Sequence, residues 1–347
     1  MTQSVSNTKG VLQALTKAIV LLLGASFILS VQAQSNTVEC TYRSTYTTRE
    51  GRGLYIQAGL KAGPGFVRIL QTFMIDLSKS WNTNNPSIEK FPDGPTHYSD
   101  PSGISSDGKS WYTLIGDRGS LYNASTNRWS DKFWLNTKGM GNLVGATDPT
   151  KDMMYIPFGY PNANRKRSML RVNLKNGDTD SDNRSFSLSQ QDHYSTAWNP
   201  FRKSLIYISI SGVYEYTWEK GWTAFFNKGL DSIAHHGACL VSVSGGRRMA
   251  LFGGLTKDGK DTTADLYILD LTKAGKEAWT KVPVDPKQKS RYARKDAACG
   301  SSGDQVIIWG GSSSSGNFGV ENVCPTQRTL VFNVKTMKWT DRYVASK

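Results

Sequence analysis

Two short stretches decide the fold: RMALFGG at residues 248–254 and QVIIWGG at residues 305–311. Each is an apolar run that ends in an aromatic residue and two glycines, and each follows a turn that contains glycine. Because the same pattern occurs twice in one chain, it predicts a repeat, and weaker copies should occur elsewhere.

Four weaker copies precede these two. The glycines that end the six copies are Gly59, Gly116, Gly159, Gly212, Gly254 and Gly311. They are 57, 43, 53, 42 and 57 residues apart. A period of about 50 residues indicates a propeller or an array of repeats.

Each copy is flanked by further strand signals. A turn such as Asp107-Gly108 and another strand-like run precede it, and a third apolar run such as LYILD at 266–270 follows. In four units a tryptophan comes next: Trp129, Trp222, Trp279 and Trp339. Four antiparallel strands per unit predict an all-β, six-bladed propeller. Two β-sandwiches, the alternative, do not predict the same glycine-ended strand in six successive units.

The repeat residues are expected to be structural. The second strand of each blade should pack between neighbouring blades, and glycine at its end tolerates close backbone approach and positive φ. Tryptophan on the fourth strand would fill the widening space between blades. The predicted blades span residues 40–92, 97–134, 141–189, 194–227, 235–284 and 294–344.

The last two units resemble the kelch repeat. The residues that carry the resemblance are Gly253, Gly254, Tyr267, Trp279, Gly310, Gly311, Leu330 and Trp339. In the first four units a single glycine replaces the pair. A signal peptide followed by one propeller is similar to the layout of secreted or surface fungal kelch proteins.

The first 33 residues predict a signal peptide. Lys9 and Lys17 precede an apolar run of 14 residues, 18–31, and VQA at 31–33 fits a cleavage site. Its removal lowers the formal net charge from +14 to +12. The mature chain, 34–347, should then be one propeller domain, a secreted or cell-surface monomer with no membrane span.

Four cysteines in an oxidising compartment suggest two disulfides, with three connectivities. If blade 6 closes against blade 1, Cys40 and Cys324 lie on the same face, and their disulfide would lock the ring. Cys239 and Cys299 occupy equivalent inner strands and are either paired or two buried thiols. Asn123 and Asn183 begin glycosylation sequons, which act only in a secreted chain.

An enzymatic function is the alternative to a binding role. A resemblance to galactose oxidases, which are kelch-like propellers, implies two histidine and two tyrosine copper ligands, with one tyrosine crosslinked to cysteine. The chain has only His97, His193, His235 and His236, and the adjacent pair should point to opposite faces of a strand. SSDGKSW at 105–111 resembles a sialidase aspartate box, but its glycine comes one place early and a tight turn explains it better.

No catalytic residue, metal ligand or cofactor is therefore assigned, although a propeller oxidase or glycan hydrolase with its site in the central channel remains the alternative.

Two basic runs map to loops on one face of the predicted propeller. One is Arg165, Lys166 and Arg167; the other contains Lys287, Lys289, Arg291, Tyr292, Arg294 and Lys295. Such a face favours a protein or an anionic polysaccharide at the cell surface as partner. Nucleic acid matches the charge but not the signal peptide. The sequence therefore predicts an extracellular, non-catalytic binding module; a merely solvated basic loop is the competing interpretation.

Overall fold

The computed structural model describes most of the unit Glu39–Lys347, one of the two units into which the chain divides. The described residues are 38–61, 67–95, 99–135, 143–159, 168–184, 194–209, 212–226, 233–256, 258–273, 278–313 and 324–346. Side chains at 226 and 233–236 are not among them. The predicted signal peptide, residues 1–33, lies outside the described residues.

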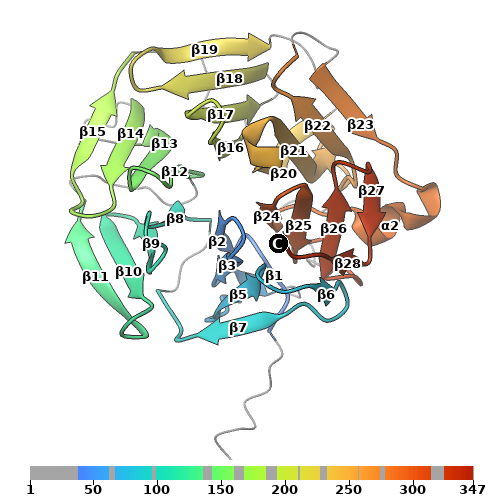
Figure 1. Cartoon of the computed structure of the whole chain (residues 1–347), viewed down its shortest axis with the longest axis horizontal. Helices are drawn as coiled ribbons and strands as arrows, with labels where there is room; N and C mark the ends of the chain where they lie inside the picture. The colour runs from blue at the N-terminus through green and yellow to red at the C-terminus, as the bar shows by residue number, and fades with distance from the viewer. Residues whose placement is uncertain are drawn as a thin grey trace, which may run out of the picture. The chain divides into compact units, whose positions relative to one another are not determined.

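Six antiparallel four-stranded sheets surround a central axis, as predicted (Figure 1). From the inner strand outward, blade 1 contains β2 (Thr45–Arg49), β3 (Gly53–Gln57), β5 (Thr72–Asp76) and β7 (Ile88–Phe91). Blade 2 contains β8 (Ser102–Ile104), β9 (Ser110–Ile115), β10 (Arg118–Asn123) and β11 (Arg128–Trp134). Blade 3 contains β12 (Ala146–Asp148), β13 (Met153–Gly159), β14 (Ser168–Asn173) and β15 (Thr179–Asp182).

The other three blades repeat this order. Blade 4 contains β16 (Tyr194–Asn199), β17 (Ser204–Ser209), β18 (Gly212–Thr217) and β19 (Gly221–Phe226). Blade 5 contains β20 (Ile233–Val243), β21 (Arg248–Thr256), β22 (Leu266–Asp270) and β23 (Trp279–Val282). Blade 6 contains β24 (Ala298–Ser302), β25 (Gln305–Trp309), β26 (Thr329–Asn333) and β27 (Lys338–Thr340).

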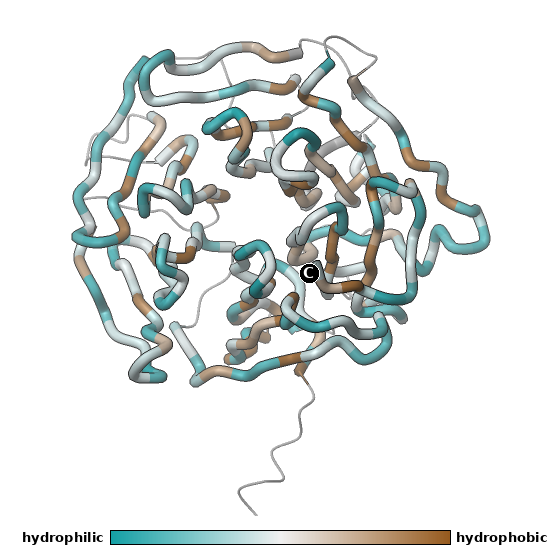
Figure 2. Tube along the Cα trace, viewed as in Figure 1, coloured by the Kyte–Doolittle hydropathy of each residue, from teal (hydrophilic) through white to brown (hydrophobic). Residues whose placement is uncertain are grey.

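The second strands form the core between blades. Every residue of β3, β17 and β25 is buried, as expected for strands covered on both faces. In Figure 2 the hydrophobic residues concentrate on the strands, whereas most turns are hydrophilic. Five of the six repeat glycines lie at or within two residues of the end of a second strand: Gly159 ends β13, Gly116 follows β9 directly, Gly59 and Gly311 come two residues after β3 and β25, and Gly254 lies two residues before the end of β21. The sixth, Gly212, is instead the first residue of a third strand, β18.

The fourth-strand tryptophans pack against aromatic residues, as predicted. The ring of Trp339 in β27 lies 5.1 Å from that of Phe332 and 5.6 Å from that of Phe252, in the neighbouring blade. Trp279 in β23 makes an edge contact with Tyr267, at 6.4 Å. These rings fill the space that widens between blades toward the rim.

The paired glycines allow one blade to contact the backbone of the next. Gly253 and Gly310 have φ values of +72° and +66°. A Cβ atom on Gly253 would lie 2.5 Å from the carbonyl oxygen of Arg294, and one on Gly310 would lie 2.5 Å from that of Thr41. The following glycine donates its N–H to the same oxygen in each blade: Gly254 to Arg294 and Gly311 to Thr41. Only glycine fits both the left-handed conformation and the contact.

Replacing Gly310 by alanine is expected to lower the free energy of unfolding by about 2–3 kcal/mol, from left-handed strain plus the clash with Thr41. Gly245→Ala is the matched control, because Gly245 has a φ of +63° but nothing within 4 Å of its Cβ position. Strain alone should cost that variant about 1 kcal/mol. Urea denaturation measures both, and equal losses would show that the close approach contributes nothing.

Blades 1 and 6 meet at the closure of the ring. β1 (Thr41–Tyr42) pairs with β4 (Leu60–Lys61), and β28 (Arg342–Tyr343) pairs with β6 (Trp81–Asn82). A disulfide joins Cys40 to Cys324, and a second joins Cys239 to Cys299. Both disulfides are therefore present, which confirms the first pairing and decides the open question about the second. No helix in the described residues is both long and apolar enough to span a membrane.

Candidate functional site

The basic run between blades 5 and 6 forms a short helical connection. η3 (Pro286–Gln288) and α2 (Lys289–Tyr292) lead from β23 toward β24 (Figure 1). Lys287, Lys289 and Arg291 are exposed. Within the described residues, no ion pair joins these three to a carboxylate. Tyr292 is half-buried, with its ring 4.8 Å from that of Trp339.

Arg294 does not belong to this surface, so its prediction as a ligand-binding residue is corrected. Its side chain is only 1% exposed. The guanidinium donates to five backbone carbonyl oxygens at 3.0–3.4 Å: those of Arg291, Tyr292, Gly310, Gln327 and Arg328. Burial lowers the pKa of Arg294 to about 9, which leaves it charged at neutral pH.

Lys295 is also buried, at 8% exposure. Its backbone exchanges two hydrogen bonds of 2.9 Å with Ser312, next to the glycine pair of blade 6. Burial lowers the pKa of its ammonium group. The prediction of Lys295 as a ligand-binding residue is corrected as well: the basic run does lie in the connection between blades 5 and 6, but its last two cations are buried.

The buried Arg294 positions exposed cations. It binds the carbonyls of Arg291 and Arg328, whose side chains are exposed and come from segments 37 residues apart in the chain. We call Lys287, Lys289, Arg291 and Arg328 the basic patch. Arg165, Lys166 and Arg167, the other predicted basic run, lie outside the described residues.

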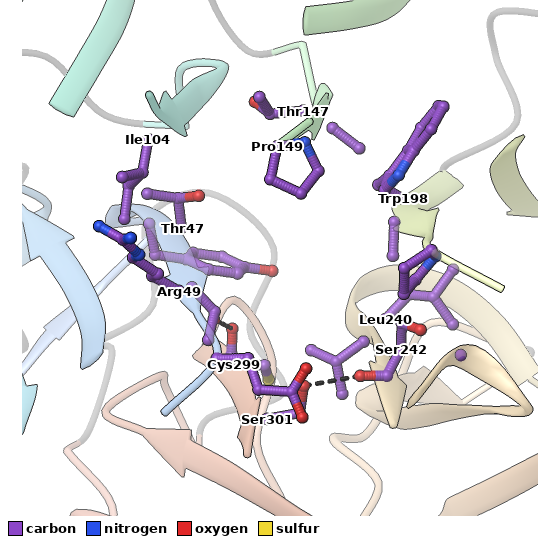
Figure 3. A pocket seen from close by; sticks show the side chains of 18 of the residues that line it. Thr47, Arg49, Ile104, Thr147, Pro149, Trp198, Leu240, Ser242, Cys299 and Ser301 are labelled. Atoms are coloured by element: carbon purple, nitrogen blue, oxygen red, sulfur yellow. Dashed lines mark hydrogen bonds between the residues drawn. The ribbon is translucent and has the colours of Figure 1, made fainter. Parts of the chain in front are cut away.

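A cavity of about 370 Å³ occupies the central channel. It is lined by the inner strands of all six blades and by the turns between first and second strands, so it lies toward the turn-bearing end of the channel. Figure 3 shows side chains from several blades around this space, among them Thr47, Thr147, Pro149, Trp198 and Leu240. A volume of this size matches small-molecule sites, which measure about 300–1,000 Å³.

Serine and threonine hydroxyls join neighbouring inner strands around the cavity. Each inner strand pairs with only one strand, so its other edge has unpaired backbone groups. Five side-chain hydroxyls donate to backbone carbonyl oxygens on that edge of the neighbouring inner strand. The pairs, with the donor first, are Thr48 and Cys299 (3.4 Å), Ser102 and Tyr46 (2.7 Å), Thr147 and Ser102 (3.4 Å), Ser195 and Ala238 (2.7 Å), and Ser301 and Ser242 (2.6 Å, dashed in Figure 3).

The turns at the mouth of the cavity are also joined. The bonds run from Arg49 to the carbonyl of Asp107 (3.1 Å), Ser106 to the carboxylate of Asp152 (2.9 Å), Asn199 to the carbonyl of Gly246 (2.7 Å), Ser244 to the carboxylate of Asp304 (2.6 Å) and the Gly303 N–H to the carboxylate of Glu50 (3.1 Å). The mouth is therefore a largely fixed ring of turns.

The cavity wall carries little charge, and its accessible surface is more apolar than polar. Among its described lining residues, Arg49 is the only cation and Glu50 the only carboxylate. Both take part in the bonds between turns given above. Burial, with a smaller effect of Asp296, raises the pKa of Tyr46 to about 12, so this phenol stays protonated at neutral pH. Such a wall suits an uncharged molecule.

The histidines add little to the described site. His97 and His193 lie outside the described residues, and so do the side chains of His235 and His236. The pairing of β20 with β21 shifts between Ala234 and Ala238, so regular strand alternation does not hold at His235 and His236. The described residues include no group of three His, Cys, Asp or Glu side chains that could hold a metal ion. Asp107-Gly108 forms a turn, with the Gly108 N–H bonded to Ser105.

Comparison with known proteins shows the fold and no more. No protein family matches the chain, and no curated protein matches it. Among solved structures, one described as "Structure of YjhT" is similar, with a TM-score of 0.62 and 12% sequence identity. The similarity covers 88% of this chain and 98% of that chain.

Proposed function

We propose that the chain is a secreted, kelch-type propeller that binds an anionic polysaccharide at a cell surface through the basic patch. Two disulfides support an oxidising, extracellular compartment. Asn183 is exposed and Asn123 half-exposed, and glycosylation of both belongs to the same proposal. In this role the propeller is a rigid scaffold that presents a loop.

The observation that carries the proposal is the arrangement of the three cations on the helical connection. Lys287, Lys289 and Arg291 are exposed and make no ion pair within the described residues. Arg294 holds the backbone beneath them in place. Cations on an ordered backbone lose less entropy on binding than cations on a flexible tail. A polyanion with regularly spaced charges can engage several of them at once.

The triple variant Lys287→Ala/Lys289→Ala/Arg291→Ala is expected to bind heparin, used here as the polyanion probe, about tenfold more weakly than the wild type. Exposed ion pairs contribute about 0.2–1 kcal/mol each, and three together account for a loss of this size. Affinity measured between 50 and 300 mM salt should also depend less steeply on salt in the variant.

The matched control is Lys132→Ala/Lys151→Ala/Lys220→Ala, which removes three exposed cations from blades 2, 3 and 4. Both triple variants change the net charge equally, so they separate a local site from general attraction. If the control loses as much affinity as the patch variant, the binding is nonspecific and the proposed site is wrong. If both triple variants still bind a protein partner, that partner binds to a different surface of the propeller.

A further inference from the structure

Opposite sides of the central cavity differ in the side chains that they present. Blade 1 lines the cavity with two hydroxyl-bearing residues in succession, Tyr46 and Thr47. The apolar residues that line it from blades 4 and 5 are Ala197, Trp198, Pro200, Leu240, Val241 and Val243. Figure 3 shows Thr47 on one side of the space, with Trp198 and Leu240 on the other.

The side-chain hydroxyls of blades 4 and 5 are withdrawn from this space. Thr196 and Ser242 belong to the wall, but their hydroxyl oxygens are buried and have no hydrogen-bond partner within the described residues. Alternation along β16 places Thr196 on the same face as Trp198, which contacts blade 3. The side chains that a molecule in the cavity meets on this side are therefore mainly apolar.

Trp198 enlarges the apolar side. The pairing of first and second strands makes it the counterpart of Thr48, Thr147 and Ser301, because each lies one residue before the last pair of its hairpin. Those three residues donate a hydroxyl to the neighbouring inner strand. In blade 4 the indole ring stacks on Tyr155 of blade 3 instead, with centroids 5.4 Å apart and planes at 9°.

Tyr46 offers the cavity a hydroxyl from the opposite side. Of the blade 1 residues that line the cavity it lies farthest from the turn, and so at the inner end of the space. Its ring packs against the buried cluster of blades 5 and 6, which holds it in place. Its hydroxyl makes no hydrogen bond in the part of the chain that the structure describes. This oxygen is not one of the buried atoms that lack a partner, so it remains accessible to a ligand.

We propose that the cavity binds a small, uncharged, mostly apolar molecule with one hydroxyl group, such as a phenol or an aromatic alcohol. The ligand hydroxyl bonds to the Tyr46 hydroxyl at the inner end, and the apolar body lies against Trp198, Leu240 and Val241. A neutral phenol both donates and accepts a hydrogen bond, so it can pair with a hydroxyl in either direction. Aromatic rings suit a wall of tryptophan, proline and branched aliphatic side chains.

The size and charge of the cavity agree with this class of ligand. Its volume of about 370 Å³ lies near the lower end of the range for small-molecule sites, which suits a molecule of one or two rings. Arg49 and Glu50 are bonded to neighbouring turns, and the described wall has no other charged side chain to pair with an ion. This site is separate from the basic patch and does not depend on the proposed function.

The test is saturation-transfer NMR titration of the full, disulfide-bonded protein with two matched pairs of probes: 2-naphthol with naphthalene, and 4-ethylphenol with ethylbenzene. Each pair differs by one hydroxyl group. At least one hydroxyl probe should bind saturably to the wild type. Tyr46→Phe should weaken that probe about three- to tenfold, the value of one hydrogen bond, and should leave the affinity for its hydrocarbon partner unchanged.

A second variant tests the apolar side. Val241→Thr keeps the shape of the side chain but replaces a methyl group by a hydroxyl. It should weaken both members of the pair about fourfold, the value of one buried methyl group. The two variants thus give different patterns, because only Tyr46→Phe distinguishes the hydroxyl probe from the hydrocarbon.

The matched control is Tyr112→Phe in β9, which removes the hydroxyl of a buried tyrosine that does not line the cavity. This variant and the triple variant of the basic patch should bind the probes as the wild type does, and thermal unfolding should show all of them folded. Absence of saturable binding by both hydroxyl probes would overturn the proposal. Equal affinity of Tyr46→Phe and the wild type would do so as well, as would an equal loss for the hydrocarbon in Tyr46→Phe.

Discussion

Arg294→Met is expected to lower the free energy of unfolding by about 3–5 kcal/mol, because each buried carbonyl oxygen left without a donor costs about 1–3 kcal/mol and losses at neighbouring groups are not additive. Methionine fills a similar volume but donates no hydrogen bond. Five carbonyl oxygens, on residues 291–292, 310 and 327–328, would lose a donor in a site that is 1% exposed. The effect is large because these carbonyls belong to three segments, which the guanidinium holds together. Urea denaturation monitored by fluorescence measures the loss.

Two further variants separate the causes. Arg294→Lys keeps a positive charge, but one ammonium nitrogen cannot reach carbonyls on three segments, so it should lose nearly as much stability as methionine. Arg291→Met is the surface control and should change stability by less than about 0.5 kcal/mol. If Arg294→Met unfolds at the same urea concentration as the wild type, the buried guanidinium does not stabilise the connection. The structural explanation of the basic patch would then be wrong.

The repeat glycines and tryptophans made most of the fold predictable. Their spacing is a local feature of the sequence, and it corresponds to the strand ends of the structure and to rings such as that of Trp339, which contacts Phe252 of the neighbouring blade. The Cys40–Cys324 pairing could be predicted because a closed ring must bring the first and last blades together. The second disulfide could not be decided in advance, since equivalent strands place the two cysteines near each other whether or not they are bonded.

The environment of single residues was harder to predict. Arg294 lies in a basic run whose sequence predicts a solvated loop. Two of the carbonyl oxygens that accept its hydrogen bonds, those of Gly310 and Gln327, come 16 and 33 residues later in the chain. Nothing in the neighbouring sequence shows that these carbonyls converge on it. The unpaired hydroxyl of Thr196 can be recognised only when the hairpins of different blades are aligned. That alignment shows Trp198 at the position where other blades have a serine or threonine. Such sites become visible only when the register of all six blades is known.

Removal of the Cys40–Cys324 disulfide is expected to have the largest effect of all. Every other pair of neighbouring blades is joined by the continuing chain, but the four-stranded sheets of blades 6 and 1 each use strands from only one end of the chain. Besides the disulfide, noncovalent contacts such as the short pairing of β28 with β6 hold these two blades together. The disulfide closes a loop with a sequence separation of 284 residues. In the chain-entropy model a loop of that length contributes about 5–6 kcal/mol. Cys40→Ala/Cys324→Ala should therefore lose about this much stability in urea denaturation.

Cys239→Ala/Cys299→Ala is the matched control, because it removes a disulfide with a separation of only 60 residues between blades already joined by the chain. The same model gives about 4 kcal/mol for it. Hydrogen exchange distinguishes the two variants further. Without Cys40–Cys324, protection should fall first at the noncovalent contacts of the closure, the Gly311 N–H bonded to Thr41 and the Arg43 N–H bonded to Asp296. If these amides stay as protected as in the wild type, β6, β28 and the glycine contact close the ring unaided, and the disulfide acts only by reducing the conformational entropy of the unfolded chain.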